Sequence, residues 1–220
     1  MIKLENISKS YHTKHGTKIL FKNLYLDMPL RQNIAILGKN GVGKSTLLRI
    51  IAGIEEPDSG SIIRDARISW PIGFSGGFNG SLSGEENCFF VSRIYGEEIK
   101  RVAEFVKNFS ELEDYFYMPF KTYSAGMKAR LAFGLSMALE FDIYLVDEIT
   151  AVGDAAFQKK CRDAFAERRK RSNVIMVSHN FDILKEYCSL VAILESGKIT
   201  LYDNIDKAIE IYKKSLNQNE

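Results

Sequence analysis

The sequence predicts an α/β fold with a mostly parallel core sheet, an N-terminal antiparallel β part and a helical subdomain. Short apolar runs typical of buried strands alternate with helical patterns through much of the chain. A glycine-rich loop joins one such strand, Ile34–Leu37, to a helix at residues 46–52. A helical stretch at about residues 85–140 interrupts the alternation. We therefore expect residues 1–220 to form one domain with an inserted helical subdomain.

The other elements follow from apolar periodicity and turn residues. Residues 1–27 are expected to form strands separated by a polar turn at residues 12–18. Pro57–Gly60 has the composition of a tight turn and leads into a strand. The remaining expected elements are, in order, strands at 61–63 and 141–146, a helix at 156–171, a strand at 173–178, a helix at 181–187, a strand at 190–194 and a short C-terminal helix at about 206–216.

The loop at residues 38–45 has the spacing G-x-x-x-x-G-K-S, which is typical of phosphate-binding loops. Its glycines allow successive backbone N–H groups to converge on one anion, and the helix that follows directs its positive N-terminus at the same point. Lys44 would reach the outer phosphates, and the Ser45 hydroxyl suits Mg²⁺. The sequence therefore predicts a P-loop NTPase that binds ATP or GTP. The expected nucleotide-binding residues here are Gly38, Lys39, Asn40, Gly41, Val42, Gly43, Lys44, Ser45 and Thr46.

A second motif lies where the apolar strand at residues 141–146 ends in two carboxylates, Asp147 and Glu148. Asp147 is placed to hold Mg²⁺ directly or through water, and Glu148 to polarise an attacking water. An acidic pair at a strand end is weak evidence alone, because many surface turns have one. Together with the phosphate-binding loop, it predicts a nucleotide hydrolase.

The order of the motifs resembles the ATPase subunits of ATP-binding-cassette (ABC) transporters over nearly the whole chain. The deciding segment is Tyr123–Met127, which opens a helix and offers Ser124 as its N-cap. Ser124 and Gly126 match the family pattern Leu-Ser-Gly-Gly-Gln, whereas the other three positions depart from it. The resemblance implies a head-to-tail homodimer in which this helix directs its N-terminus at ATP bound by the partner.

The same resemblance implies roles for three further residues. His179, after the strand at residues 173–178, matches a histidine that contacts the terminal phosphate. Asp154 matches an aspartate that crosses the dimer interface, and Tyr11 matches an aromatic residue that stacks on adenine. From the residues alone, a structural histidine and a core or surface tyrosine are the alternatives.

One family position is missing from the sequence. The family has a glutamine between the phosphate-binding loop and the helical subdomain, which reads Mg²⁺ and touches the membrane partner. This chain has no glutamine between Gln32 and Gln158. Asn79 is the nearest chemical substitute, a shorter amide that would need a bridging water.

The run Asp147–Asp154, with Trp70–Pro71 and Gly76–Phe78, resembles the ATPases that export capsular polysaccharide. This resemblance implies a homodimer beneath a pair of integral membrane permease subunits, at the cytoplasmic face of the bacterial inner membrane. Its cofactors would be ATP and Mg²⁺, and its cargo a lipid-linked polysaccharide. Only a short segment follows Lys198, so we expect no separate sugar-binding domain of the kind that some O-antigen exporters carry.

Composition favours this hypothesis over others. No apolar run reaches the ~20 residues of a membrane span. The net charge is only +2, and the basic run Glu167–Arg171 is read as a solvated helix face, so no nucleic-acid partner is expected. Three widely spaced cysteines indicate reduced thiols. The alternatives are O-antigen or teichoic acid as cargo, a soluble cassette ATPase of DNA repair or translation, and a nucleotide-gated subunit without hydrolysis.

Overall fold

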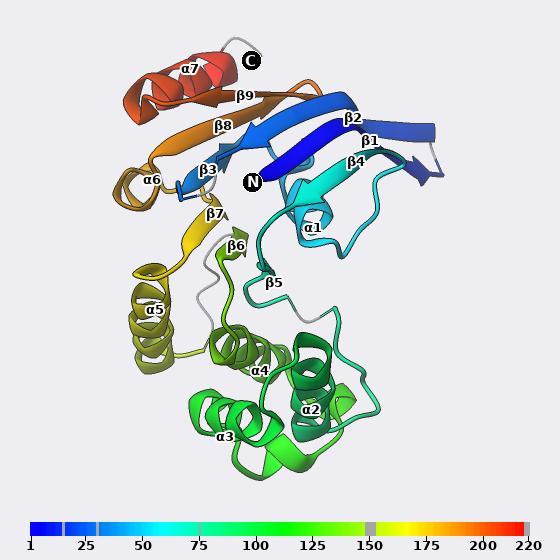
Figure 1. Cartoon of the computed structure of the whole chain (residues 1–220), viewed down its shortest axis with the longest axis vertical. Helices are drawn as coiled ribbons and strands as arrows, with labels where there is room; N and C mark the ends of the chain where they lie inside the picture. Colours follow the sequence, from blue (N-terminus) through cyan, green and yellow to red (C-terminus); the bar gives the residue numbers. More distant parts are fainter. Residues whose placement is uncertain (15, 30, 75, 148–152, 218–220) are drawn as a thin grey trace. The chain divides into compact units, whose positions relative to one another are not determined.

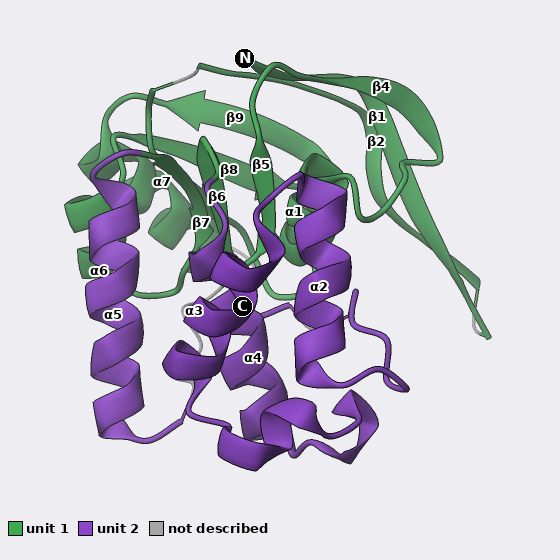
Figure 2. Cartoon of the chain, turned by 60° about the horizontal axis from the view of Figure 1, so that its bottom comes forward, with its two compact units in different colours: residues 1–71, 141–149, 172–220 green, residues 72–140, 150–171 purple. Residues whose placement is uncertain are grey.

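The computed structural model describes residues 1–14, 16–29, 31–74, 76–147 and 153–217 (Figure 1). The chain divides into two compact units (Figure 2). Unit 1 comprises residues 1–71, 141–149 and 172–220, and unit 2 comprises residues 72–140 and 150–171. Unit 1 holds both sheets, and unit 2 is helical.

The first sheet of unit 1 is antiparallel, with strand order β2-β1-β4. It consists of β1 (Ile2–Thr13), β2 (Gly16–Met28) and β4 (Ser59–Arg64). The polar turn predicted at residues 12–18 is wrong in extent, because β1 and β2 stay paired until Thr13 lies opposite Gly16. The polar side chains there serve an exposed two-stranded ribbon, in which His12 Nδ1 lies 3.0 Å from Thr17 Oγ1.

The second sheet of unit 1 has strand order β5-β6-β7-β3-β8-β9 and is parallel except for β9, which confirms the predicted mostly parallel core. The prediction missed β5, a four-residue edge strand that ends in Pro71. A proline is tolerated there because an edge strand has a side without a partner. The strands are β3 (Ile34–Leu37), β5 (Ile68–Pro71), β6 (Ile143–Asp147), β7 (Asn173–Val177), β8 (Leu190–Glu195) and β9 (Lys198–Tyr202).

Unit 1 also contains α1 (Lys44–Ala52), α6 (Phe181–Tyr187) and α7 (Ile205–Asn217). Helix α1 supplies four fully buried aliphatic side chains to a core that draws on both sheets. Burying each such side chain stabilises the fold by about 1.5–3 kcal/mol. The helix that follows the glycine-rich loop is therefore anchored by its buried aliphatic side chains in this core.

Unit 2 contains four α-helices and two 3₁₀ turns among its described residues. Ser83 and Glu86 form a capping box at the start of α2. The apolar spacing predicted within residues 99–109 is that of α3, whose Val102 and Val106 are fully buried. The elements are α2 (Gly84–Tyr95), α3 (Ile99–Ser110), η1 (Glu113–Tyr117), η2 (Phe120–Thr122), α4 (Ala125–Ala138) and α5 (Ala155–Arg169).

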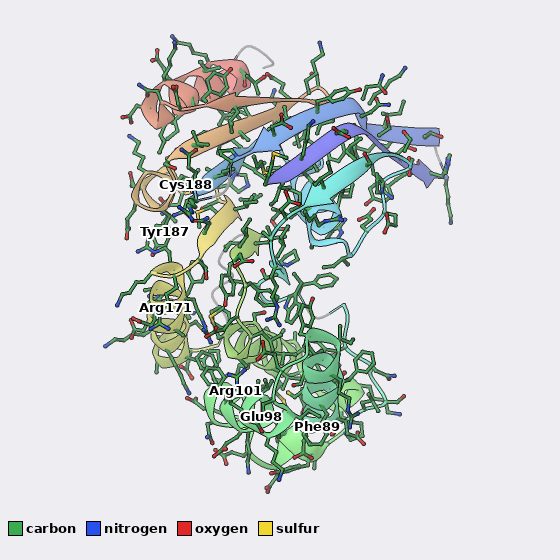
Figure 3. The ribbon with its side chains drawn as sticks, in the orientation of Figure 1. Phe89, Glu98, Arg101, Arg171, Tyr187 and Cys188 are labelled. Atoms are coloured by element: carbon green, nitrogen blue, oxygen red, sulfur yellow. The ribbon has the colours of Figure 1, made fainter. Side chains whose placement is uncertain are left out.

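Two arginines close the C-terminal end of α4. Arg101 of α3, labelled in Figure 3, donates to the Ala138 carbonyl at 3.2 Å and pairs with Glu97 at 2.6 Å. Arg168 of α5 donates to the Met137 carbonyl at 2.6 and 3.1 Å. Carbonyls in the last turn of a helix have no partner within that helix, so these bonds satisfy them. The sequence had suggested that the basic run at residues 167–171 is a solvated helix face. These bonds show that the run is not uniformly solvated.

The three cysteines are free and buried, including Cys188 directly after α6 (Figure 3). Burial raises the pKa of the Cys161 thiol to about 12, which keeps it protonated near neutral pH. Within the described part of the chain, no helix combines the length and the apolar character that a bilayer span requires.

Candidate functional site

The glycine-rich loop runs from the end of β3 to the start of α1, as its spacing predicted. Lys44 is the first residue of α1 and is only 8% exposed. Its ammonium folds back over the loop, donating to the Gly38 carbonyl at 2.7 Å and to the Lys39 carbonyl at 3.1 Å. Ser45 follows it in the first turn and is half-buried. The loop therefore places a cation and a hydroxyl together at a helix N-terminus.

Gly43 makes the bend into α1 possible. Its φ of 112° lies in the left-handed region, which residues with a Cβ rarely adopt. A Cβ at this position would also lie 2.8 Å from Cζ of Phe21. Both the backbone conformation and the surrounding space thus require glycine here.

The strand register brings the two sequence motifs to one edge of the parallel sheet. In the register of β3, β7 and β6, Ile36 lies opposite Val177, which in turn lies opposite Asp147. Asp147 is the last residue of β6, and the loop at residues 38–43 begins directly after β3. Parallel strands end at the same edge, and ligands of open α/β sheets bind there. The half-buried Asp147 carboxylate therefore lies at the sheet edge from which the phosphate-binding loop starts.

His179 follows β7, the strand between the other two, and so belongs to the same edge. It is exposed and lines an open cavity of about 670 Å³. The next residue, Asn180, caps α6 by accepting from the backbone N–H groups of Asp182 and Ile183 at 2.9 and 3.2 Å. This cap fixes the chain direction immediately after the histidine.

Tyr11 lies on β1 and is 37% exposed. Its hydroxyl donates to Glu55 at 2.5 Å and lies 3.2 Å from Thr46 Oγ1 in the first turn of α1. Arg49 donates to both hydroxyls, at 3.3 and 3.1 Å. Arg49 and Glu55 were not among the site residues predicted from the sequence. The spacing of Thr46 and Arg49, three residues apart on one helix, was the only available signal.

Unit 2 carries Ser124 and Gly126 at the start of α4, both exposed. The Ser124 hydroxyl accepts from the Met127 N–H at 3.2 Å, so the predicted N-cap is confirmed. Tyr123, which departs from the family pattern, is buried and donates to the Tyr115 carbonyl at 2.6 Å. Burial raises the pKa of Tyr123 to about 12. The departure is thus explained by packing within unit 2.

Asp154 caps α5 in unit 2, where its carboxylate accepts from the Phe157 N–H at 2.9 Å. The other carboxylate oxygen pairs with Arg130 at 3.3 Å. The hydrogen bond from the Phe157 N–H, with smaller contributions from the nearby Arg130 guanidinium, lowers the pKa of this carboxyl and outweighs the opposing effect of desolvation. Asp154 is exposed, so capping the helix leaves it at the surface. Its dimer role stays a prediction.

Asn79, the suggested substitute for the missing glutamine, is exposed in unit 2. Its side-chain oxygen accepts from the Ser81 N–H at 2.9 Å, and its backbone N–H donates to Asn87 Oδ1 at 2.9 Å. These bonds give it a local role in the turn before α2. A magnesium role for Asn79 stays a prediction. Glu148, the predicted general base, lies outside the described residues.

Comparison with known proteins identifies the family. The family model described as ABC transporter matches residues 21–151, from β2 through the glycine-rich loop and the end of β6. The chain belongs to the ABC transporter family. The family assignment confirms the predicted ATPase class and nucleotide-binding character.

The relatives of this ABC transporter protein include ATP-binding proteins of capsule export. It is 56% identical to the polysialic acid transport ATP-binding protein KpsT of Escherichia coli, over 98% of this chain and all of the relative. It is 48% identical to the capsule polysaccharide export ATP-binding protein CtrD of Neisseria meningitidis serogroup B (strain ATCC BAA-335 / MC58), over 96% of this chain and 98% of the relative. These relatives confirm the resemblance noted in the sequence.

The fold of this ABC transporter protein is that of solved ATP-binding cassettes. The cassette MJ0796, solved as a dimer in a post-hydrolysis state bound to ADP and Pi, matches with a TM-score of 0.72. The match covers 92% of this chain and 98% of that cassette at 22% identity. The predicted fold class is thereby confirmed.

Proposed function

We propose that this chain is the ATP-binding and ATP-hydrolysing subunit of an ABC transporter that exports capsular polysaccharide. The structural observation that supports ATP hydrolysis is the register of the parallel sheet, in which Ile36, Val177 and Asp147 lie side by side on adjacent strands. It brings the phosphate-binding loop, Asp147 and the segment before His179 to one edge. The cargo is supported by relatives named for polysialic acid transport and capsule polysaccharide export, which match along nearly their whole length.

Each residue at this edge has a defined task in the proposed reaction. The backbone N–H groups of residues 38–46 would bind the phosphates, and Lys44 would exchange its bonds to the Gly38 and Lys39 carbonyls for bonds to phosphate oxygens. His179 would donate a hydrogen bond to the terminal phosphate. Glu148, next after Asp147, would accept a proton from the attacking water. Tyr11 would stack on the base.

The oxygen donors at the site fit Mg²⁺. The hydroxyl of Ser45 and the carboxylate of Asp147 are hard oxygen ligands, and Mg²⁺ is usually held by one or two protein groups together with substrate phosphates. When bound, the ion would neutralise charge on the phosphates. Asn79 would make a water-mediated contact through its amide oxygen, which accepts from the Ser81 N–H and has a second lone pair.

We propose that two copies of the chain pair head to tail. Ser124 and Gly126 are exposed at the N-terminus of α4, where a helix dipole favours an anion. They would contact ATP bound by the other copy, and Asp154 would lie across the interface. The dimeric cassette MJ0796 supports this arrangement by analogy. The two units would then be the core and the helical subdomain of one ATPase domain.

The proposed membrane partner is a pair of integral permease subunits, with the ATPase dimer at the cytoplasmic face of the bacterial inner membrane. ATP-driven closure of the dimer would shift the permease toward passage of a lipid-linked polymer, and hydrolysis would reset it. Relatives named for teichoic acid and O-antigen export are less similar to this chain than those named for capsule export. Capsular polysaccharide is therefore the preferred cargo.

Replacing Glu148 with Gln tests the hydrolytic role. The amide cannot accept the proton, so phosphate release should slow by about 100-fold or more while ATP binding persists. Light scattering with ATP present should then detect a stable dimer of the variant. Glu140→Gln, which changes an exposed glutamate outside the proposed site, is the matched control. Wild-type turnover by the Glu148 variant would remove that residue from its assigned role.

A further inference from the structure

Four side chains from three parts of unit 1 share hydrogen bonds beside the phosphate-binding loop. Tyr11 comes from β1, Thr46 and Arg49 from α1, and Glu55 from the turn after α1. Glu55 accepts from the Tyr11 hydroxyl at 2.5 Å and from Arg49 Nε at 2.9 Å, using different carboxylate oxygens. Arg49 also donates to the hydroxyls of Tyr11 and Thr46. The group forms a closed network.

The network restrains the tyrosine ring through its hydroxyl. Tyr11 donates to Glu55 and accepts from Arg49, so two fixed partners approach the same oxygen atom. Lys9 adds a third restraint, with its ammonium 5.5 Å from the ring centroid and 3.1 Å from Glu55. A ring held at both its edge and its face has few positions open to it. This matters for a side chain that must present a flat face to a base.

The charges of the network are matched. Partial burial opposes ionisation of Glu55, but hydrogen bonds from Tyr11, Arg49 and Lys9 outweigh it and lower the pKa of the carboxyl. Glu55 is therefore an anion at neutral pH and holds two cations beside the tyrosine. Partly exposed ion pairs contribute only about 0–1 kcal/mol to the free energy of unfolding. The ion pairs of Glu55 therefore add little to the stability of the fold.

We propose that Arg49 and Glu55 are positioning residues for nucleotide binding, which hold Tyr11 in place to receive the base. The contact between the Tyr11 and Thr46 hydroxyls links the tyrosine ring to the first turn of α1, one residue after Ser45. A nucleotide would therefore meet base and phosphate contacts that are already fixed relative to each other. The inference rests on the proposed role of Tyr11 in base stacking, and assigns two residues to its support.

Binding measurements with two ligands test the proposal. ATP contains a base, whereas inorganic tripolyphosphate offers only the phosphates, and both are titrated with Mg²⁺ by calorimetry. Tyr11→Phe keeps the ring and removes the hydroxyl, and Glu55→Ala removes its anchor. Both variants should bind ATP about 3–10-fold more weakly, the effect of one or two lost hydrogen bonds. Both should bind tripolyphosphate with wild-type affinity, and the loss in ATP turnover should fall on KM rather than kcat.

Two controls make the outcomes distinct. Glu5→Ala breaks a comparable ion pair with Lys3 on the same strand and should bind ATP like the wild type. Tyr11→Ala removes the ring and should weaken ATP binding more than Tyr11→Phe. Wild-type ATP affinity in Tyr11→Phe and Glu55→Ala, or equal losses for ATP and tripolyphosphate, would overturn the inference. Wild-type affinity in Tyr11→Ala would also overturn the base contact itself, while leaving ATP hydrolysis at the sheet edge standing.

Discussion

At the scale of single residues, the site depends on backbone geometry as much as on charged groups. Lys44 can cover the loop because α1 starts directly after the bend at Gly43. That bend needs a positive φ and the space in front of the Phe21 ring. A side chain there would move the loop N–H groups that are proposed to bind phosphate, although every charged residue would remain.

Gly43→Ala should therefore abolish measurable ATP binding and destabilise the fold by about 1–3 kcal/mol. Gly96→Ala is a matched control, because Gly96 also has a positive φ of 67° but a Cβ added there would meet no neighbouring atom within 4 Å. The free energy of unfolding of Gly96→Ala should fall by about 1 kcal/mol, and this variant should bind ATP like the wild type. Urea unfolding and calorimetric titration measure the two effects. Wild-type ATP binding by Gly43→Ala would show that the bend is not essential to the site.

The site residues that could be predicted from the sequence are those marked by a local pattern. Lys44 and Ser45 are recognisable because the loop spacing itself encodes their positions, and Asp147 because an apolar strand precedes it. Arg49 and Glu55 were not found, because their partner Tyr11 is 38 and 44 positions away in the chain. Contacts of that separation depend on the pairing of β1 with the rest of unit 1, which one sequence does not reveal.

At the scale of elements, two helices proposed to face a second copy of the chain begin with side-chain caps. Ser124 caps α4 and Asp154 caps α5. Both side chains cap their helices and are still exposed at the surface. A loss of activity on changing either residue thus has two possible physical origins, the helix and the interface.

The pH dependence of stability isolates the helix contribution of Asp154. Its pKa is lowered in the folded chain, mainly by the Phe157 N–H, so its ionised form stabilises the fold above the ordinary carboxyl pKa of about 4. That contribution is lost as pH falls through the lower, folded-state value. Asp154→Asn still caps the helix but cannot ionise.

The difference in unfolding free energy between wild type and Asp154→Asn should thus be largest at pH 6–7 and shrink below about pH 4. Urea titrations at several pH values measure it. Asp154→Ala, which lacks the cap, should be the least stable at neutral pH. A difference that stays constant down to the lowest pH would contradict the assigned charge-assisted cap.

Element prediction succeeded for strongly periodic helices and largely buried strands, and failed for partly exposed strands. The amphipathic pattern of α3 and the apolar run of β6 were read correctly from the sequence. Strand β5 was missed because it is a partly exposed edge strand that ends in proline. The β1–β2 ribbon was cut short because its exposed polar residues resemble a turn. Edge and surface strands lack the burial pattern that identifies central ones.

At the scale of the whole molecule, function depends on partners outside this chain. The core and the sheet-edge site follow from the sequence of one subunit, whereas the proposed signature contact of Ser124 needs a second copy. The proposed permease carries the cargo. The identity of the cargo is therefore inferred from the similarity of this chain to capsule-export proteins. No physical feature of the described residues of unit 1 or unit 2 selects a polysaccharide by itself.

The location of capsular polymer in host cells that carry only the Glu148→Gln variant tests the central claim most directly. Polymer at the cell surface and inside the cell would be measured separately, with a Glu140→Gln strain as control. Our account predicts that polymer accumulates inside the Glu148→Gln cells and that their surface is bare, with normal capsule in the control. A normal surface capsule, with the variant verified as the only copy, would contradict ATP-driven capsule export by this chain.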